Sequence, residues 1–409
     1  MKNNRIYTKI DFLFLLLLIM VSSQTVWFGT NNIHSYSTYV NLFALLVAMV
    51  LFGLVEIFKK GEKNNGSTYL GMFTLCAMAV LSGFGNGSLN LEYIVWVCLI
   101  IGAFYYTSLV PWNKFSIIYE DIMVLMAGGG IVFYVLGLIA PSLIERLPEI
   151  RNSGGFRFYN AFICVVPTFA DRLFGPFREP GVFQIFINLA LALTLFCRQQ
   201  INIWRMAVLS IAVILTMSTT GYIAMFLLIM FFLISKRKLN GKNRGWSFAI
   251  LFLITGFFYL YLQTDLLSAE GDVFWKLYDT ENDSTVSRLG AITANIQMFF
   301  ENPVFGVGIS GVEEKFARYV ADYWHVSSSH NTNSLLLNFA AFGILYGIVF
   351  CIGLWRLCKR LSKGDLFRAF VFFVFLAILL SGENVTRYIL VFIFMFYGLK
   401  ATSKGYAIS

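Results

Sequence analysis

Residues 283–343 read DSTVSRLGAITANIQMFFENPVFGVGISGVEEKFARYVADYWHVSSSHNTNSLLLNFAAFG, and this stretch holds the polar motifs around which the rest of the chain is arranged. Apolar residues recur at helical spacing after Arg288, which predicts an amphipathic helix on the membrane surface. A turn rich in Pro and Gly follows over 302–308. A serine-rich loop then brings His330 and Asn331 to the start of a long apolar segment. The stretch is therefore the candidate functional site.

The composition is that of a membrane protein. Of the 409 residues, 58% are hydrophobic and only 13% are charged, against roughly 45–50% apolar and about 25% charged residues in soluble domains. A net charge of +9 would suggest nucleic-acid binding in a soluble chain, but in a membrane protein Lys and Arg gather in the cytoplasmic loops. We expect an all-α polytopic membrane protein with no nucleic-acid partner.

Apolar runs of about the 17–25 residues needed to cross a bilayer recur along the whole chain. The pairs within 201–235 and 367–399 are the least clearly divided, because each is one apolar stretch broken only by a small polar turn. We expect about twelve transmembrane helices, near residues 10–28, 37–58, 68–86, 91–110, 117–141, 179–197, 201–217, 219–235, 246–263, 332–356, 367–381 and 385–399.

The basic residues support this topology. If both termini are cytoplasmic, the inner segments hold 21 of the 31 Lys and Arg residues, although the outer segments are longer. No cleavage-site pattern follows the first apolar run, so we expect an uncleaved first helix and not a signal peptide. The predicted parts are N-terminal membrane helices (1–141), a first large outer loop (142–178), central membrane helices (179–263), a second large outer loop with the amphipathic helix (264–331) and C-terminal membrane helices (332–409).

Arginine side chains in the two large outer loops are candidates for anion binding. Arg178 lies in a turn rich in Pro and Gly beside the next membrane helix, and Arg288 begins the amphipathic helix. A guanidinium group keeps its charge and binds phosphate oxygens in pairs. Two such groups at one interfacial cavity would suit a pyrophosphate, with Glu179 as a neighbouring substrate contact. The alternative is that each Arg only reaches toward lipid headgroups.

His330 and Asn331 precede the apolar helix expected near residue 332. The positive end of a helix disfavours the imidazolium form and so favours the neutral ring that a general base requires. Asn331 is a candidate substrate contact, and the alternative is that the Ser-His-Asn run only caps the helix. Tyr323 and Trp324 fit two roles equally well, since they would stack on sugar rings or anchor the loop at the membrane interface.

Other residues in the helices fit structural roles. The six cysteines sit mostly in apolar runs without a CxxC pair or a His partner, so we expect neither a disulfide nor a metal site. Glu120, Asp121, Glu383 and Arg387 lie near helix ends and form no run that would relay protons through a helix. The triple glycine at 128–130 predicts close helix packing or a kink.

The block of Arg288, the 302–308 turn, His330, Asn331 and Gly343 resembles the signature region of the O-antigen ligase and polymerase superfamily of bacterial cell-envelope polysaccharide assembly. The resemblance implies a fold like that of GT-C glycosyltransferases. It also implies an enzyme without metal or other cofactor that takes glycans from undecaprenyl pyrophosphate on the outer face of the inner membrane. By position, His330 corresponds to the essential His of this superfamily and Arg288 to its loop Arg.

One turn departs from the pattern of the ligases. These usually carry a second essential Arg after a Ser in the outer turn between the seventh and eighth helices, whereas here this turn reads MSTTGY from Met217 to Tyr222. The chain instead has Arg178 in the sequence FREPG, which is similar to a motif of polysaccharide polymerases. The resemblance therefore favours a polymerase over a ligase.

The expected function is a polysaccharide polymerase that joins undecaprenyl-pyrophosphate-linked repeat units into O-antigen, capsule or exopolysaccharide chains, including those of lipopolysaccharide. His330 would take or orient the proton of the acceptor hydroxyl, and Arg178 and Arg288 would neutralise the departing pyrophosphate. Partners would be the lipid-linked donor and acceptor, membrane lipids, and a chain-length regulator and a flippase as candidate proteins. Two alternatives stay open: a ligase that transfers glycan to lipid A-core, and a flippase or other transporter of lipid-linked glycans.

Overall fold

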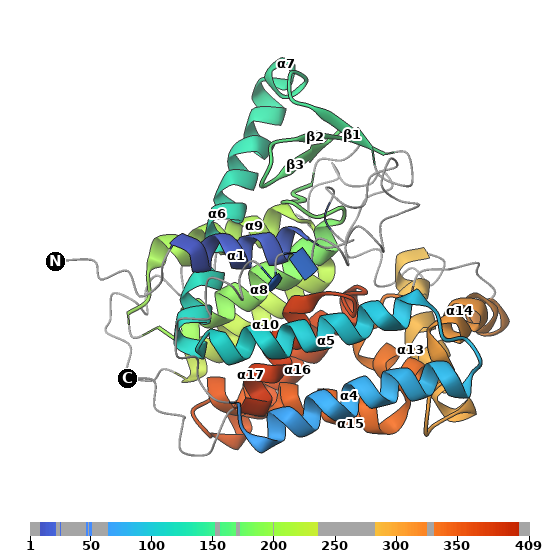
Figure 1. The fold of residues 1–409 in the computed structure, drawn as a ribbon. Coiled ribbons are helices and arrows are strands. Elements are labelled where there is room, and N and C mark those ends of the chain that lie inside the picture. The colour runs from blue at the N-terminus through green and yellow to red at the C-terminus, as the bar shows by residue number, and fades with distance from the viewer. Residues whose placement is uncertain are drawn as a thin grey trace.

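The computed structural model describes residues 9–21, 25, 46–47, 49–50, 64–151, 156–168, 172–198, 200–235, 283–324 and 331–400, and helices make up most of them (Figure 1). Apolar helices lie at the positions of ten expected spans. They are α1 (Lys9–Met20), α4 (Gly66–Gly85), α5 (Leu91–Leu109), α6 (Trp112–Ile139), α8 (Pro180–Phe196), α9 (Ile203–Leu215), α10 (Thr219–Ser235), α15 (Ser334–Leu361), α16 (Leu366–Gly382) and α17 (Ile389–Lys400).

Both of the weakly divided stretches separate into two helices, since α9 ends before α10 begins and α16 ends before α17 begins. The helices expected near 37–58 and 246–263 fall largely or wholly outside the described residues, so the count of twelve stays a prediction. By length and composition, α4, α5, α6 and α15 are able to cross a membrane, and α8, α9, α10, α16 and α17 are shorter apolar helices. This architecture is consistent with a polytopic membrane protein.

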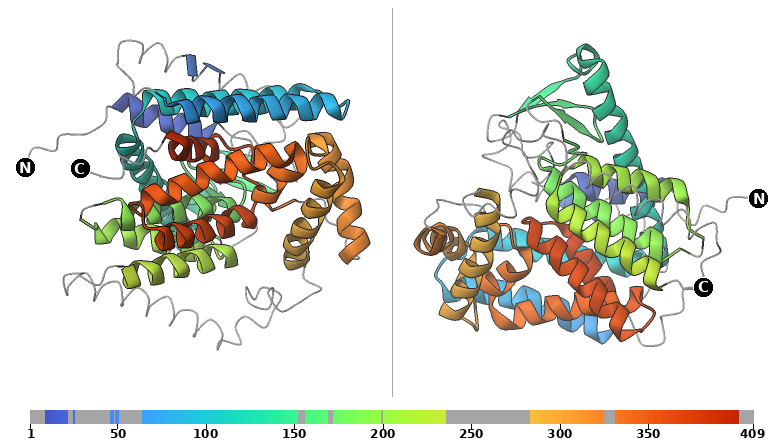
Figure 2. Two further views of the ribbon diagram at one scale, coloured as in Figure 1. Left: turned by 90° about the horizontal axis from the view of Figure 1, so that it is seen from below. Right: turned by 180° about the vertical axis from the view of Figure 1, so that it is seen from behind.

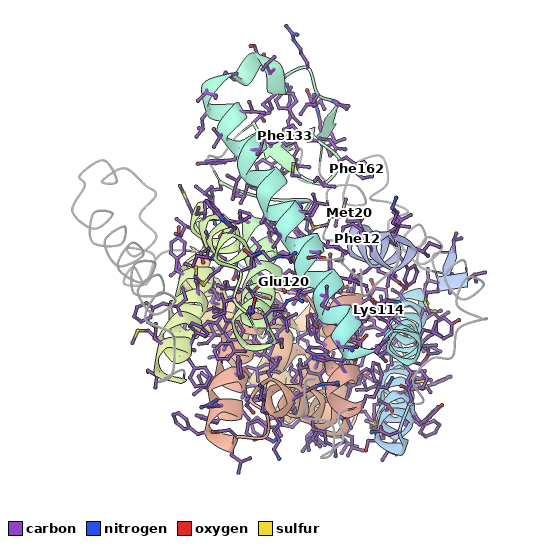
Figure 3. The ribbon with its side chains drawn as sticks, turned by 90° about the vertical axis from the view of Figure 1, so that its left-hand side faces the viewer. Phe12, Met20, Lys114, Glu120, Phe133 and Phe162 are labelled. Atoms are coloured by element: carbon purple, nitrogen blue, oxygen red, sulfur yellow. The ribbon has the colours of Figure 1, made fainter. Side chains whose placement is uncertain are left out.

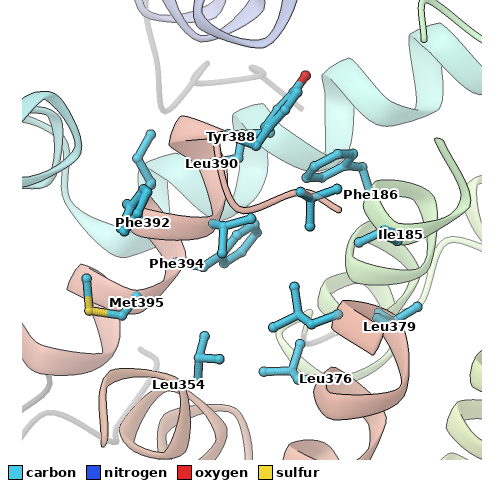
Figure 4. Packing of buried hydrophobic residues seen from close by; sticks show 14 of the residues in the cluster. Ile185, Phe186, Leu354, Leu376, Leu379, Tyr388, Leu390, Phe392, Phe394 and Met395 are labelled. Atoms are coloured by element: carbon cyan, nitrogen blue, oxygen red, sulfur yellow. The ribbon is translucent and has the colours of Figure 1, made fainter. Parts of the chain in front are cut away.

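The last helix lies at the centre of the bundle. All residues of α17 from Ile389 to Leu399 are buried, as expected for a helix that is apolar on every side. It packs against α15, α5, α4 and α1, and Figures 1 and 2 show it enclosed by other helices. Aromatic rings fill this core, and the rings of Tyr388 and Phe186 of α8 lie tilted against each other at a centroid distance of 4.6 Å (Figure 4). The central position of α17 brings the ends of helices far apart in sequence together.

Hydrogen bonds and ion pairs identify the two ends of the bundle. At one end, the Lys400 side chain donates to the Thr107 carbonyl oxygen (2.8 Å), and Lys114 pairs with Asp11 (2.6 Å). At the other end, Arg387 makes two bonds of 3.2 and 3.1 Å to Glu92. We call the end that holds Arg387 the loop end, because the large loops lie there. Successive helices therefore alternate in direction.

A small antiparallel sheet lies in the first large loop, and the predicted all-α architecture missed it. Strands β1 (Glu149–Arg151), β2 (Arg157–Asn160) and β3 (Val165–Pro167) pair in that order beyond the short helix α7 (Pro141–Ile144). Phe158, Val165 and Phe174 form a small core of their own. Each strand has only three or four residues, which is too short for a clear alternating pattern.

The glycines of α6 serve close packing, as one of the two predicted roles. A Cβ added at Gly130 would lie 3.0 Å from Leu173, and one at Gly129 would lie 3.1 Å from Ile163. The neighbour is the loop with the sheet and not another helix. Figure 3 shows this part of α6, near Phe133 and Phe162, on the opposite half of the helix from Lys114 and Glu120. The first large loop is thus fixed against the membrane helix that precedes it.

Helices α13 (Asp283–Glu301) and α14 (Gly308–Trp324) form a hairpin at the loop end (Figure 1). The predicted helix after Arg288 is present, and its small residues Ala291 and Ala294 are buried. Its larger residues, such as Ile296 and Phe300, remain exposed. An exposed apolar face beside the ends of membrane helices fits the expected position at a membrane surface.

Candidate functional site

The turn between α13 and α14 fills a break in α15. Gly343 has φ 80° and ψ −177°, which interrupts the helix, so the Ile344 N–H and the Ala340 carbonyl do not form the bond of a regular helix. The turn supplies a partner to each group, since Val307 N donates to the Ala340 carbonyl (2.8 Å) and Ile344 N donates to the Pro303 carbonyl (2.8 Å). The motif residues of the 302–308 turn and Gly343 are thus parts of one backbone junction.

Two glycines make this junction possible. A Cβ at Gly306 would lie 2.4 Å from the Ala341 backbone, and a Cβ at Gly343 would lie 2.0 Å from the Val304 carbonyl oxygen. Both residues also have φ above 70°, where only glycine is unstrained. The Asn86 amide further donates to the Gly306 carbonyl at 3.1 Å. The junction therefore fixes α13 and the start of α15 against each other and against α4.

A pair of asparagines joins α13 to the start of α15. The side-chain amides of buried Asn295 and half-buried Asn331 exchange two hydrogen bonds of 2.9 Å each. The cap of α15 is Asn333, whose side chain accepts from Leu336 N at 2.9 Å. Asn331 is thus bound to α13 and is not the residue that caps the helix. Because Arg288 lies two helical turns before Asn295, it belongs to the same side of α13.

The side chains of three predicted site residues lie outside the described part of the structure. His330 lies outside the described residues. Tyr323 and Trp324 end helix α14, but the structure describes only their backbone. Their proposed roles therefore stay predictions.

Arg178 and Glu179 are held by the aromatic residue before them. Phe177 is fully buried, stacks on Phe186 of α8 at 5.5 Å and lies tilted against Phe183 of the same helix at 5.6 Å. Glu179 occupies the N-cap position of α8, and Pro180 follows at the first helical position, where proline is favoured. Arg178 is half-buried and Glu179 is exposed. Both predicted residues therefore lie at the loop end, on a rigid turn.

The structure brings another arginine to this end. Arg172 donates from Nε to the Thr216 carbonyl and from Nη2 to the Met217 carbonyl, each at 3.0 Å. Its neighbour Leu173 donates its backbone N–H to the Leu215 carbonyl at 2.8 Å. These contacts place a guanidinium group at the turn that begins the MSTTGY sequence. That turn has no Arg of its own, and it receives one from the first large loop.

The Glu383 carboxyl group also lies at the loop end. Ser334 Oγ donates to the Glu383 carbonyl (2.6 Å) and accepts from Val385 N (2.8 Å), which fixes the turn after α16 to the start of α15. The Glu383 side chain lies against Gly181 of α8, where a Cβ would be 2.1 Å from Oε1. Gly181 is therefore needed to make room for this carboxyl group.

Electrostatic interactions connect four charged groups, which we call the arginine–carboxyl cluster: Arg172, Glu179, Arg288 and Glu383. The pKa of Glu383 is raised to about 8, chiefly by burial and also by the negative charge of Glu179 and its hydrogen bond, while Arg288 and Arg172 oppose the increase. Burial lowers the pKa of Arg172, and the charge of Arg288 lowers it too. The groups come from three parts of the chain that are distant in sequence, since Arg172 and Glu179 lie seven residues apart. Together they present guanidinium donors and carboxyl groups at one end of a helical bundle.

The sequence thus predicted Arg288 and Glu179 of this cluster but missed Arg172 and Glu383 as site residues. Glu383 stood out only as a charged residue near a helix end, and Arg172 only as one of ten outer basic residues. The missing Arg in the turn at 217–222 was the one available signal for Arg172. Nothing in the sequence showed which residue would replace it.

A bundle of apolar helices with a polar, arginine-containing end is consistent with a polytopic membrane protein. Residues 204–352, from α9 to the middle of α15, match the model of a family described as Wzy_C, O-antigen ligase. This match supports the O-antigen ligase and polymerase superfamily for the chain. Arg288, Asn331 and the 302–308 turn lie inside the matched residues. No curated protein matches the chain.

The family match supports a glycosyltransferase-like enzyme with a polysaccharide-related role as ligase or polymerase. It also implies lipid-linked glycans as substrates, and with the apolar helices it suggests a protein of the inner membrane.

Proposed function

We propose that the protein is a polysaccharide polymerase that joins repeat units carried on undecaprenyl pyrophosphate. The observation that carries the proposal is the arginine–carboxyl cluster, since two guanidinium groups meet at one end of a membrane bundle of this family. One guanidinium group binds two phosphate oxygens through two parallel N–H···O bonds, and it stabilises charge on a leaving diphosphate. Arg178, on the same turn as Glu179, is a further ligand of this diphosphate.

In the proposed reaction, the donor and the acceptor react with the help of one base of the protein. The acceptor hydroxyl oxygen attacks the anomeric carbon of the donor sugar, and the bond from that carbon to the diphosphate oxygen breaks. The electron pair leaves with the diphosphate, where Arg172 and Arg288 neutralise it. The hydroxyl proton goes to His330, which directly precedes Asn331 in the chain. The Asn295–Asn331 pair supports this role, because it fixes the residue after His330 to the helix that carries Arg288.

The orientation is also proposed. Both termini would lie in the cytoplasm, and the loop end would face the outside. Support comes from the opposite end, where the residues predicted to be cytoplasmic gather: Lys114 pairs with Asp11, Arg205 pairs with Glu120, and Lys400 bonds to Thr107. The division into membrane helices 1–141, 179–263 and 332–409 with two outer loops follows from this orientation.

A ligase is the second candidate, and Arg172 is the observation that favours it. The polymerase was preferred partly because the turn at 217–222 has no Arg. Since the Arg172 guanidinium binds the carbonyls of Thr216 and Met217, that turn has an arginine after all. The FREPG sequence around Arg178 still favours the polymerase.

Mutant cells distinguish the candidates. We expect a strain that lacks the protein to display surface glycans of single repeat units. Undecorated lipid A-core with accumulated long polymer would instead identify a ligase, and lipid-linked units retained on the inner face would identify a flippase. In the complemented strain, His330→Ala is expected to give the phenotype of the deletion at normal protein levels. Long chains of normal length from this variant would refute the proposed base.

A further inference from the structure

The two carboxyl groups of the arginine–carboxyl cluster interact with each other. The Glu383 carboxyl lies against Gly181, two residues after Glu179, and a side-chain hydrogen bond with Glu179 helps to raise the pKa of Glu383. Among the described residues, neither of them makes an ion pair within 4.0 Å of Arg172 or Arg288. Two carboxyl groups bond to each other only when one of them carries a proton. The guanidinium groups, in contrast, are left without a carboxylate in contact.

We propose that Glu383 and Glu179 share one proton, and that this shared proton allows the arginine–carboxyl cluster to bind the lipid diphosphate. Because the single O–H group is bonded within the carboxyl pair, its effect on the ligand is electrostatic: it removes one negative charge and leaves the charges of Arg172 and Arg288 available to the diphosphate. This inference rests on the proposed function for the nature of the ligand.

The charge balance supports the proposal. With both carboxyl groups ionised, the four groups have no net charge, and an approaching diphosphate meets two anions. With one shared proton, the cluster has a net charge of +1, and the remaining negative charge is bonded within the pair. Interactions of this kind are strong where protein excludes water from part of the site. The proton therefore converts a neutral cluster into an anion site.

The position of Glu383 is fixed, which keeps its carboxyl group beside the turn that carries Glu179. Its backbone is held by Ser334, three residues after Asn331, and its side chain lies against Gly181. The residue is half-buried, so part of it remains open to a ligand. Glu383 thus connects the start of α15, which follows His330, to the start of α8, which follows Arg178. Both neighbours belong to the proposed donor site.

The charged groups that act on Glu383 come from each neighbouring segment: Glu179 from α8, Arg288 from α13 and Arg172 from the first large loop. Tyr222 of α10 acts on Arg172. Burial and Glu179 together raise the pKa of Glu383 to about 8. The carboxyl is therefore protonated at neutral pH and loses its proton under mildly alkaline conditions.

Binding of undecaprenyl diphosphate without glycan, to the full chain in phosphatidylethanolamine and phosphatidylglycerol nanodiscs, tests this proposal between pH 6.5 and 9.5. Affinity of the unmodified protein is expected to fall about tenfold per pH unit above roughly pH 8, as for the loss of one bound proton. Glu383→Gln keeps a neutral hydrogen-bond donor, so its affinity is expected to stay at the low-pH value throughout. The exposed α14 residue supplies the control, Glu314→Gln, which should follow the unmodified protein.

An alkaline decrease that persists in Glu383→Gln overturns the proposal, as does weaker binding of this variant at neutral pH. Glycan transfer by the same preparations separates the two hypotheses. If diphosphate binds with the expected pH dependence but no glycan is transferred, the proposed function fails and the inference stands. If polymer forms while binding is independent of pH, the inference fails alone. Loss of turnover in Glu383→Gln with unchanged binding would assign the carboxylate to proton transfer and also overturn the proposal.

Discussion

Two clusters at opposite ends of the bundle have the same composition but opposite pairing. Each contains two arginines and two carboxylates. Away from the loop end, Glu120 receives Arg198 at 2.6 Å and Arg205 at 3.1 Å, and Arg205 also pairs with Asp121. At the loop end, the carboxyl groups of the arginine–carboxyl cluster bond to each other instead. Composition alone therefore does not distinguish a structural cluster from a binding site.

The pairing explains what each cluster is able to do. Glu120 is 1% exposed, and each of its oxygens pairs with an arginine, so this carboxylate is fully used in holding the cluster together. It joins α6 to the segment around the start of α9. In the arginine–carboxyl cluster the cations have no carboxylate in contact among the described residues, and Glu383 carries a proton at neutral pH. Partly buried arginines without a carboxylate in contact cost folding free energy, and a bound anion that pairs with them would explain why they are present.

The largest expected effect is on stability, at the Glu120 cluster. Glu120→Gln leaves two arginines without their common partner, and removing one member of a buried ion pair costs about 3–5 kcal/mol. We expect a large loss of folded protein in thermal unfolding followed by fluorescence-detected size exclusion. Turnover per folded molecule should stay unchanged.

The matched control is Glu149→Gln in the exposed sheet, where Arg151 pairs with this carboxylate at 3.0 Å. Exposed pairs contribute only about 0–1 kcal/mol, so this variant should unfold like the unmodified protein. If Glu120→Gln folds normally but loses turnover, the Glu120 cluster is not merely structural, and the comparison breaks.

The second effect is on turnover, at the loop end. Arg288→Ala removes a cation that the proposed reaction needs when charge develops on the diphosphate. Loss of one such group typically lowers turnover about 100-fold or more. Initial rates of glycan transfer in nanodiscs measure it, with the folded fraction determined in parallel.

Arg318→Ala on the neighbouring helix α14 is the control, since Arg318 is exposed and lies over the Tyr319 ring at 5.3 Å. It should keep nearly full turnover. Equal rates for Arg288→Ala and the unmodified protein would remove Arg288 from the site and leave the arginine–carboxyl cluster as a second structural cluster.

The sequence was sufficient for most of the helices, because each depends on a local property. The helix expected over 219–235 is α10 (Thr219–Ser235), and the division before it follows the polar turn. Helix α6 begins at Trp112, five residues before the expected start, because Pro111 can begin a helix that carries Asn113 and Lys114 in its first turn. Hydropathy marks only the apolar part of a helix, so the polar turns at its ends escape it.

The site was predictable only where its residues lie beside a local motif. Arg288 and Asn331 adjoin the 302–308 turn and the start of α15, so the motif pointed to them. Arg172 and Glu383 reach the site through contacts between distant segments, which depend on how the helices pack around α17. The sequence also contains two sets of arginines and acids of equal charge, and only the contacts show which set is paired.

The third expected effect is a pH dependence of stability that distinguishes the arginine–carboxyl cluster from the Glu120 cluster. A carboxyl whose pKa is raised from 4.5 to about 8 holds its proton more tightly in the folded protein than in the unfolded chain. Its contribution to stability is therefore complete below pH 4.5 and decreases as the pH rises to about 8. Glu383→Gln has no such proton, so its unfolding temperature should decrease less between pH 5 and 8 than that of the unmodified protein. The variant should therefore be the more stable of the two, most clearly above pH 8. Thermal unfolding in detergent across this range measures the difference, and Glu149→Gln should keep the full slope. If Glu383→Gln has the same slope as the unmodified protein, the carboxyl is not protonated in the folded state, and the two clusters differ in geometry alone.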